Sequence, residues 1–113
     1  MAAGGDVSEQ PNPKPAHGDL WLDMLVDPIV TFLPYSIWTM GMERRDLGIA
    51  HYGTPLQLDN GRDMRQDARE EALDLPAYLW GVSYLSAREG RWIAAWAWRM
   101  VGRMILVLAW SLR

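Results

Sequence analysis

Residues 59–85 constrain the fold more than any other stretch, because helical spacing sorts them into two adjoining stripes of opposite character. One stripe is acidic, with carboxylates at i, i+4, i+7 and i+11. The other is apolar and has the spacing of a surface that packs against other helices. The acidic residues are Asp63, Asp67, Glu70 and Asp74, with Glu71 beside them, and the apolar residues are Met64, Ala68, Ala72, Leu75, Leu79 and Val82. The stretch predicts an amphipathic helix over about residues 61–88.

The acidic stripe runs directly into an apolar segment, where an unpaired carboxylate is costly. Like charges at this spacing also repel by roughly a few tenths of a kcal/mol per pair. Two interpretations are open. In the first, the stripe is a solvated helix face whose charge is offset by Arg62, Arg65 and Arg69. In the second, a divalent cation gathers the carboxylates, and we favour it as the simplest compensation.

The same stretch resembles a known family. Residues 51–63 read HYGTPLQLDNGRD and residues 67–79 read DAREEALDLPAYL. These runs are similar to small phage and actinobacterial proteins of the MazG-like, all-α nucleoside triphosphate pyrophosphohydrolase family, over roughly residues 42–85. The most specific parts are Tyr-Gly-Thr-Pro-Leu at 52–56, Asn-Gly-Arg-Asp at 60–63 and Glu-Glu-x-x-Asp at 70–74. Members of the family bind Mg²⁺ through helix carboxylates and split nucleoside triphosphates into a monophosphate and pyrophosphate.

The resemblance implies roles for five carboxylates. The Glu-x-x-Asp half of the family's metal motif maps onto Glu71 and Asp74. The other half, Glu-Glu-x-x-Glu on an earlier helix, is not intact, and only Glu43 and Asp46 stand in that region. We therefore expect Glu43, Glu71 and Asp74 to bind Mg²⁺, with Asp67 and Glu70 as the catalytic candidates. Either of these two would complete the metal shell or act as base toward the water that attacks the α-phosphorus.

Five more residues are candidates for contact with the nucleotide. The loop of residues 52–61 is longer than most connections between helices, and long loops tend to be functional. In the family this loop lies close to the metal helix, so Tyr52, Asn60 and Arg62 are predicted to hold substrate; the alternative is a plain connector. Arg99 and Arg103 lie at i and i+4 on the last predicted helix. They are candidates for a substrate phosphate, and the alternatives are ion pairs with the acidic stripe or exposed arginines.

Composition excludes several other kinds of site. The chain has 113 residues, enough for one domain, and contains no cysteine, so disulfides and thiolate sites cannot form. An isoelectric point near 5.2 argues against a nucleic-acid polymer as partner. His17 and His51 are too isolated to suggest a zinc site. Residues 1–18 carry alternating prolines and no secretory signal pattern. We expect them to be a flexible lead-in to a single helical domain of residues 19–113 in a cytoplasmic protein, with membrane association left open.

The segment before the acidic helix is apolar but broken by Pro28 and Pro34. It predicts a short helix at 19–26, a turn or short segment at 28–33, and a helix at 35–51. The residues expected to cover the core are Trp21, Leu22, Leu25, Phe32 and Leu33. The Asn60-Gly61 pair predicts a turn, and Asp59 or Asn60 is expected to cap the helix that follows. Pro76 predicts a kink in that helix.

The last predicted helix, residues 91–112, is rich in tryptophan and follows Gly90. A membrane span through it is disfavoured, because each mid-helix arginine costs about 2.5–3.5 kcal/mol while each Leu, Ile or Val recovers only about 0.3–0.6. An interfacial helix and burial in a bundle or dimer are the alternatives. The fold predicted from all of this is an all-α small helical bundle that is completed by homo-oligomerisation. The predicted function is Mg²⁺-dependent nucleoside triphosphate pyrophosphohydrolysis, and the alternative is a non-catalytic assembly or membrane-associated protein that uses this helix.

Overall fold

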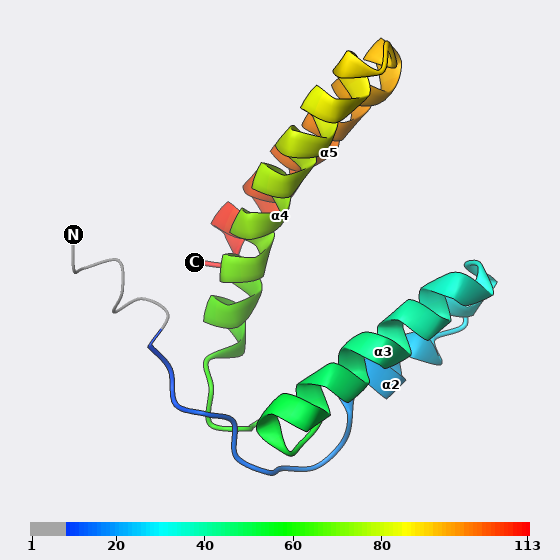
Figure 1. Cartoon of the computed structure of the whole chain (residues 1–113). Helices are drawn as coiled ribbons and strands as arrows, with labels where there is room; N and C mark the ends of the chain where they lie inside the picture. The colour runs from blue at the N-terminus through cyan, green and yellow to red at the C-terminus, as the bar shows by residue number, and fades with distance from the viewer. Residues whose placement is uncertain (1–8) are drawn as a thin grey trace. The chain divides into compact units, whose positions relative to one another are not determined.

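The computed structural model describes residues 9–113, and its regular elements are all helical (Figure 1). They are α2 (Leu20–Leu25), the 3₁₀ turn η1 (Val30–Phe32), α3 (Tyr35–Tyr52), α4 (Met64–Arg88) and α5 (Trp92–Ser111). The described residues contain no strand, which confirms the all-α class. Their contacts divide them into two units, residues 10–62 and residues 63–113, with Glu9 grouped with the latter. The single domain and the homo-oligomer stay predictions.

In the first unit, α2 lies along α3 (Figure 1). Asp19 begins α2, because its carboxylate accepts a hydrogen bond from the backbone N–H of Leu22 over 3.1 Å. The same carboxylate accepts a 2.7 Å hydrogen bond from Nε of Arg45 on α3. Leu25 packs so closely on Gly41 that a methyl group added there would meet it at 2.8 Å. An ion pair and one tight apolar contact therefore hold these helices together.

The core expected for this unit is only partly correct. Leu25 is buried, with 2% of its surface exposed, and Trp21 is half-buried. Phe32 is 90% exposed and Leu33 is 52% exposed, so neither covers a core. The two prolines explain this, since they restrict the intervening chain to one 3₁₀ turn that packs mainly against α2.

The loop after α3 is bound to the segment that precedes α2. Gly53 ends α3 with φ 77°, the left-handed conformation that suits glycine at a helix end. Gln57 is 7% exposed and bridges the two segments: its Oε1 accepts from the Ala16 N–H, and its Nε2 donates to the carbonyls of Ala16 and Gly18. Residues 11–18, expected to be flexible, thus have specific partners. Residues 1–8 of that predicted lead-in lie outside the described residues.

The second unit is a hairpin of two long antiparallel helices, α4 and α5 (Figure 1). The N-cap of α4 is Asp63, whose side chain accepts from the Gln66 N–H. The expectation that Asp59 or Asn60 caps this helix is therefore wrong, because Asp59 has φ 59° and Asn60 uses its side chain within the turn. The helix continues through Pro76, and Gly90 makes the turn into α5 with φ 76°.

Small side chains form the most deeply buried part of the contact surface between α4 and α5. On α5 the buried residues recur every seven positions, and on α4 two of them are also seven apart, which is the period of a coiled-coil seam. These buried residues are Ala95, Gly102 and Ala109 on α5 and Pro76, Ser83 and Ser86 on α4. The expected apolar stripe is partly wrong, because Leu75 is 45% and Val82 is 37% exposed. Large side chains at the seam would prevent the close approach that the small ones permit.

Candidate functional site

The predicted catalytic and metal-binding residues of α4 lie on the side of the helix that faces away from α5. Pro76 and Ser83 define the side that contacts α5. Glu71 and Asp74 are exposed, whereas Asp67 and Glu70 are half-buried. Glu70 accepts a hydrogen bond from Gln66 Nε2 over 3.0 Å.

These carboxylates do not converge on one point within the hairpin. Among residues 9–113 no group of three or more His, Asp or Glu side chains could hold a metal ion. The third predicted ligand, Glu43, is exposed on α3 and belongs to the other unit. The residues of α4 alone therefore do not form a magnesium site, and the magnesium site stays a prediction.

The predicted loop residues have structural partners of their own. Tyr52 is 48% exposed at the end of α3, with its ring edge against His51 at 4.3 Å between centroids. Asn60 is 2% exposed; its side-chain oxygen accepts from the Arg62 N–H and its carbonyl accepts from the Lys14 N–H. The Arg62 guanidinium donates to the Pro11 carbonyl over 2.7 Å. These contacts fit the plain-connector alternative, and a role in holding substrate stays a prediction.

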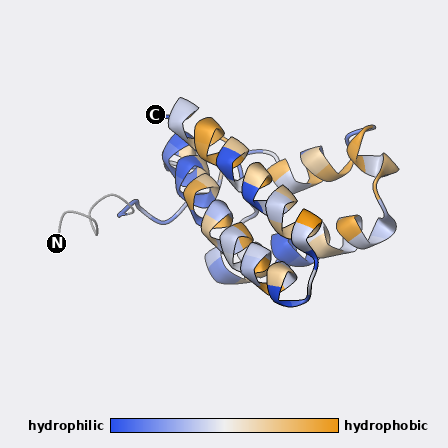
Figure 2. Ribbon diagram, turned by 90° about the horizontal axis from the view of Figure 1, so that it is seen from above, coloured by the Kyte–Doolittle hydropathy of each residue, from blue (hydrophilic) through white to orange (hydrophobic). Residues whose placement is uncertain are grey.

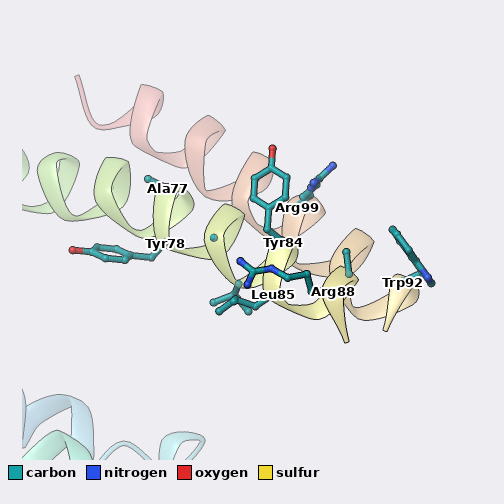
Figure 3. Close-up of a pocket in the computed structure, with 10 residues that line it drawn as sticks. Ala77, Tyr78, Tyr84, Leu85, Arg88, Trp92 and Arg99 are labelled. Atoms are coloured by element: carbon teal, nitrogen blue, oxygen red, sulfur yellow. The ribbon is translucent and has the colours of Figure 1, made fainter. Parts of the chain in front are cut away.

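The two arginines of α5 lie against aromatic rings of α4. The guanidinium carbon of Arg99 is 5.6 Å from the ring centroid of Trp80 and 5.0 Å from that of Tyr84, beside which it lies in Figure 3. Its Nε also donates to Ser83 Oγ over 3.0 Å. Arg103 is 5.5 Å from the Trp80 centroid and donates to the Met100 sulfur. Both arginines are thus held by cation–π contacts.

Sequence reasoning identified the arginines but missed their partners on α4. In a hairpin that turns at Gly90, a residue of α4 lies beside the residue of α5 that is about equally many positions away from Gly90 along the chain. Trp80 and Tyr84, one helical turn apart, therefore come opposite Arg99. The sequence did contain a signal for this contact. Trp80 and Tyr84 before Gly90 are one helical turn apart, and so are Arg99 and Arg103 after it.

Large apolar side chains lie on the outside of the hairpin. The outer face of α5 has helical spacing and consists of Ile93, Met100, Met104, Val107 and Leu108. Ile93 is 84% exposed, and Met104, Val107 and Leu108 are between 62% and 66% exposed. Figure 2 shows hydrophobic residues along the helix that ends at the C-terminus. On α4, Tyr78 and Leu85 also point away from α5 (Figure 3). Exposed apolar side chains gathered on one helix face are typical of a surface that binds a partner or a lipid.

Tryptophans are spread over both ends of α5. Trp92, Trp96 and Trp110 are 70%, 63% and 62% exposed. By length and composition, α5 is the one helix of the described residues that could cross a membrane, and only 17% of its apolar window is buried. A core helix of a soluble protein would be mostly buried, so the hairpin by itself leaves most of the apolar surface of α5 uncovered.

Comparison of the chain with protein-family models, with curated proteins and with solved structures gives no match. The resemblance to MazG-like proteins therefore gains neither support nor contradiction from these comparisons.

Proposed function

We propose that the α4–α5 hairpin is a non-catalytic membrane-binding module that lies in the plane of a lipid surface, with the outer face of α5 in the lipid. The observation that carries the proposal is the distribution of side-chain size. Small residues such as Ala95, Gly102 and Ala109 line the seam, while large apolar side chains are left outside. This distribution is typical of helix pairs in lipid, where close backbone approach holds helices together and apolar side chains face the acyl chains.

The charges of the hairpin favour an interfacial position over a membrane span. Arg69 donates to the Leu112 carbonyl over 3.2 Å, so the charged half of α4 lies beside the C-terminal half of α5. If α5 spanned a bilayer, Arg99 and Arg103 would lie near the middle of the span. Asp74 of α4 would enter it too, because α4 runs antiparallel beside α5. Each costs about 2.5–3.5 kcal/mol at the bilayer centre, whereas each of the Leu, Ile and Val side chains of α5 recovers only about 0.3–0.6. In an interfacial position the acidic side of α4 stays in water.

The breadth of the apolar surface favours lipid over a second copy of the chain. A helix that pairs with one partner needs only a narrow apolar stripe. The exposed apolar residues of α5 lie on several sides of the helix, since Trp96, Val101 and Met104 are 63%, 40% and 64% exposed and point in different directions. Tryptophan is also the residue that favours the boundary between lipid and water.

Binding to vesicles tests the proposal. The protein is expected to sediment with phospholipid vesicles. A variant with Met104→Glu and Val107→Glu, which adds two charges to the outer face of α5, is expected to lose most of this binding. The matched control carries Met40→Glu and Leu47→Glu, because these α3 residues are also more than half exposed. No sedimentation of the unaltered protein would reject the proposal. If the unaltered protein forms a dimer that the variant with Met104→Glu and Val107→Glu loses, while both bind vesicles equally, the outer face of α5 would instead be assigned to contact with a second copy of the chain.

A second candidate function is the magnesium-dependent pyrophosphohydrolysis of nucleoside triphosphates. It is supported by the resemblance and by the exposure of Glu71 and Asp74, three residues apart on α4 and open to an incoming ion. The test is release of pyrophosphate from a panel of nucleoside triphosphates with Mg²⁺, measured for the unaltered protein and for Asp74→Ala. Activity that the substitution removes would support this candidate. Equal activity in both proteins, or none in either, would reject it.

A further inference from the structure

Arg99 is held in a fixed position by three side chains of α4. Its Nε donates to Ser83 Oγ, and that hydroxyl donates in turn to the Trp80 carbonyl over 2.6 Å. The rings of Trp80 and Tyr84 lie against the guanidinium at 5.6 and 5.0 Å. Ser83 has no exposed surface, so its hydrogen bond to Arg99 is shielded from water. Among residues 9–113 the terminal nitrogens of Arg99 have no hydrogen-bond acceptor, so they can bind an external one.

Arg103 extends this arrangement by one helical turn. It shares the Trp80 ring with Arg99, at 5.5 Å from its centroid, and is exposed. Within residues 9–113, the contacts of the two arginines are with Ser83, Met100 and aromatic rings, and none is with a carboxylate. Two positive charges therefore lie together with no carboxylate partner in the part of the chain that the structure describes.

The C-terminal part of the chain has a net positive charge. Residues 75–113 hold five arginines and one acid, Glu89, which gives a net charge of +4. Glu89 lies 3.9 Å from Arg91 at the hairpin turn, away from the pair. A pair of planar guanidinium groups with free N–H donors matches the oxygens of a phosphate.

We propose that Trp80, Ser83, Tyr84, Arg99 and Arg103 form a binding site for the phosphate of an anionic phospholipid headgroup. The inference rests on the membrane-binding function proposed above and names the lipid that the surface selects. Exposed Trp96 on α5 lies beside the arginine pair in helical spacing, so the site borders the part of α5 assigned to the lipid boundary. A choline headgroup carries its own cation beside its phosphate, whereas a glycerol headgroup does not, so the site favours the anionic lipid.

Vesicle binding with two lipid compositions tests the site. The unaltered protein is expected to bind phosphatidylcholine vesicles that contain phosphatidylglycerol more tightly than vesicles of phosphatidylcholine alone. An arginine near an anionic surface contributes about fivefold to the affinity. A variant with both Arg99→Gln and Arg103→Gln is therefore expected to lose about fivefold per arginine on the anionic vesicles and nothing on the neutral ones. The control is Arg65→Gln, which removes a single arginine charge from an exposed position at the N-terminal end of α4.

Three outcomes would overturn the site. The first is an unchanged preference for anionic vesicles in the double glutamine variant. The second is full anionic binding by a variant with Arg99→Lys and Arg103→Lys, which keeps the charges but loses the planar groups stacked on Trp80. The third is a saturable change of tryptophan fluorescence on titration with inorganic pyrophosphate, combined with equal binding to both kinds of vesicle, which would assign the arginines to a free phosphate. Absence of binding to either kind of vesicle would instead reject the proposed function itself.

Discussion

Gly102 of α5 lies against the ring of Trp80 on α4, so that a methyl group added at Gly102 would meet Cε3 of the ring at 3.5 Å and Cζ3 at 3.6 Å. The Pro76 Cα of α4 is next, at 3.7 Å. These are ordinary van der Waals distances for one methyl group, with no room for a larger side chain. The approach of the two helices is thus set at a glycine in the middle of the seam.

Gly102→Leu is expected to destabilise the hairpin. Its added atoms have to enter the space held by Trp80 and Pro76, and overpacking of this kind typically costs about 1–3 kcal/mol. Gly81→Leu is the matched control, because it lies inside α4 and a Cβ there meets no atom within 4 Å. The free energy of unfolding from urea denaturation, followed by circular dichroism, is expected to fall for Gly102→Leu only. Equal free energies of unfolding for the two variants would contradict the placement of Gly102 in the contact between α4 and α5.

The stability of the first unit is expected to depend on pH through Asp19. Burial alone raises the pKa of this carboxyl, but hydrogen bonds from Arg45 and from the Leu22 N–H outweigh burial and hold the pKa below its ordinary value. A carboxyl whose pKa is lowered by folding stabilises the fold above its ordinary pKa of about 3.9. That stabilisation is lost as the pH falls through the lower pKa of the folded state.

Asp19→Asn separates the ion pair from the helix cap. Asparagine caps helices about as well as aspartate, so the substitution removes mainly the interaction with Arg45. At neutral pH the variant is expected to unfold at a lower temperature than the unaltered protein, and the difference is expected to shrink as the pH is lowered below about 4. A difference that stays constant down to strongly acidic pH would show that the ion pair contributes nothing.

Gln57→Ala is expected to detach residues 11–18 from the loop. The substitution removes the bonds between Gln57 and the backbone of Ala16 and Gly18, and also the 2.7 Å bond that Thr54 Oγ1 donates to Gln57 Oε1. Loss of a partner for buried polar groups costs about 1–3 kcal/mol. Hydrogen exchange of the Ala16 amide measures the effect. Gln66→Ala, which removes a single side-chain bond to Glu70, is the control. Slow exchange of Ala16 in both variants would contradict the assigned role.

The helix ends could be predicted from the sequence because local chemistry sets them. Pro34 precedes α3, Gly53 ends it in a left-handed conformation, and Gly90 makes the turn between α4 and α5. The predicted start of α4, near residue 61, is earlier than the observed start at Met64. The Asn60-Gly61 turn uses the polar side chain that was expected to cap the helix, and Asp63 takes that role.

The seam between α4 and α5 could not be predicted in the same way. An interpretation based on apolar periodicity assumes that the largest apolar side chains face inward. It therefore predicts that Leu75 and Val82 contact the neighbouring helix. The packed side is formed instead by Pro76 and Ser83, because small residues permit a closer approach of the two backbones. The acidic stripe was predicted with the correct spacing, yet spacing alone does not decide whether carboxylates converge on an ion.

Cysteine labelling on vesicles tests the orientation of the hairpin. The chain has no cysteine, so a single introduced thiol reports only its own position. Met104→Cys places the thiol on the outer face of α5, and Asp74→Cys places it on the side of α4 that faces away from α5; both positions are exposed in the free protein. In solution the two thiols are expected to react at similar rates with a charged, water-soluble reagent. With vesicles present, the Met104→Cys thiol is expected to become protected while the Asp74→Cys thiol keeps its rate, because only the former enters the lipid. Protection of both thiols would indicate that the whole hairpin is inserted, and protection of neither would place α5 in water.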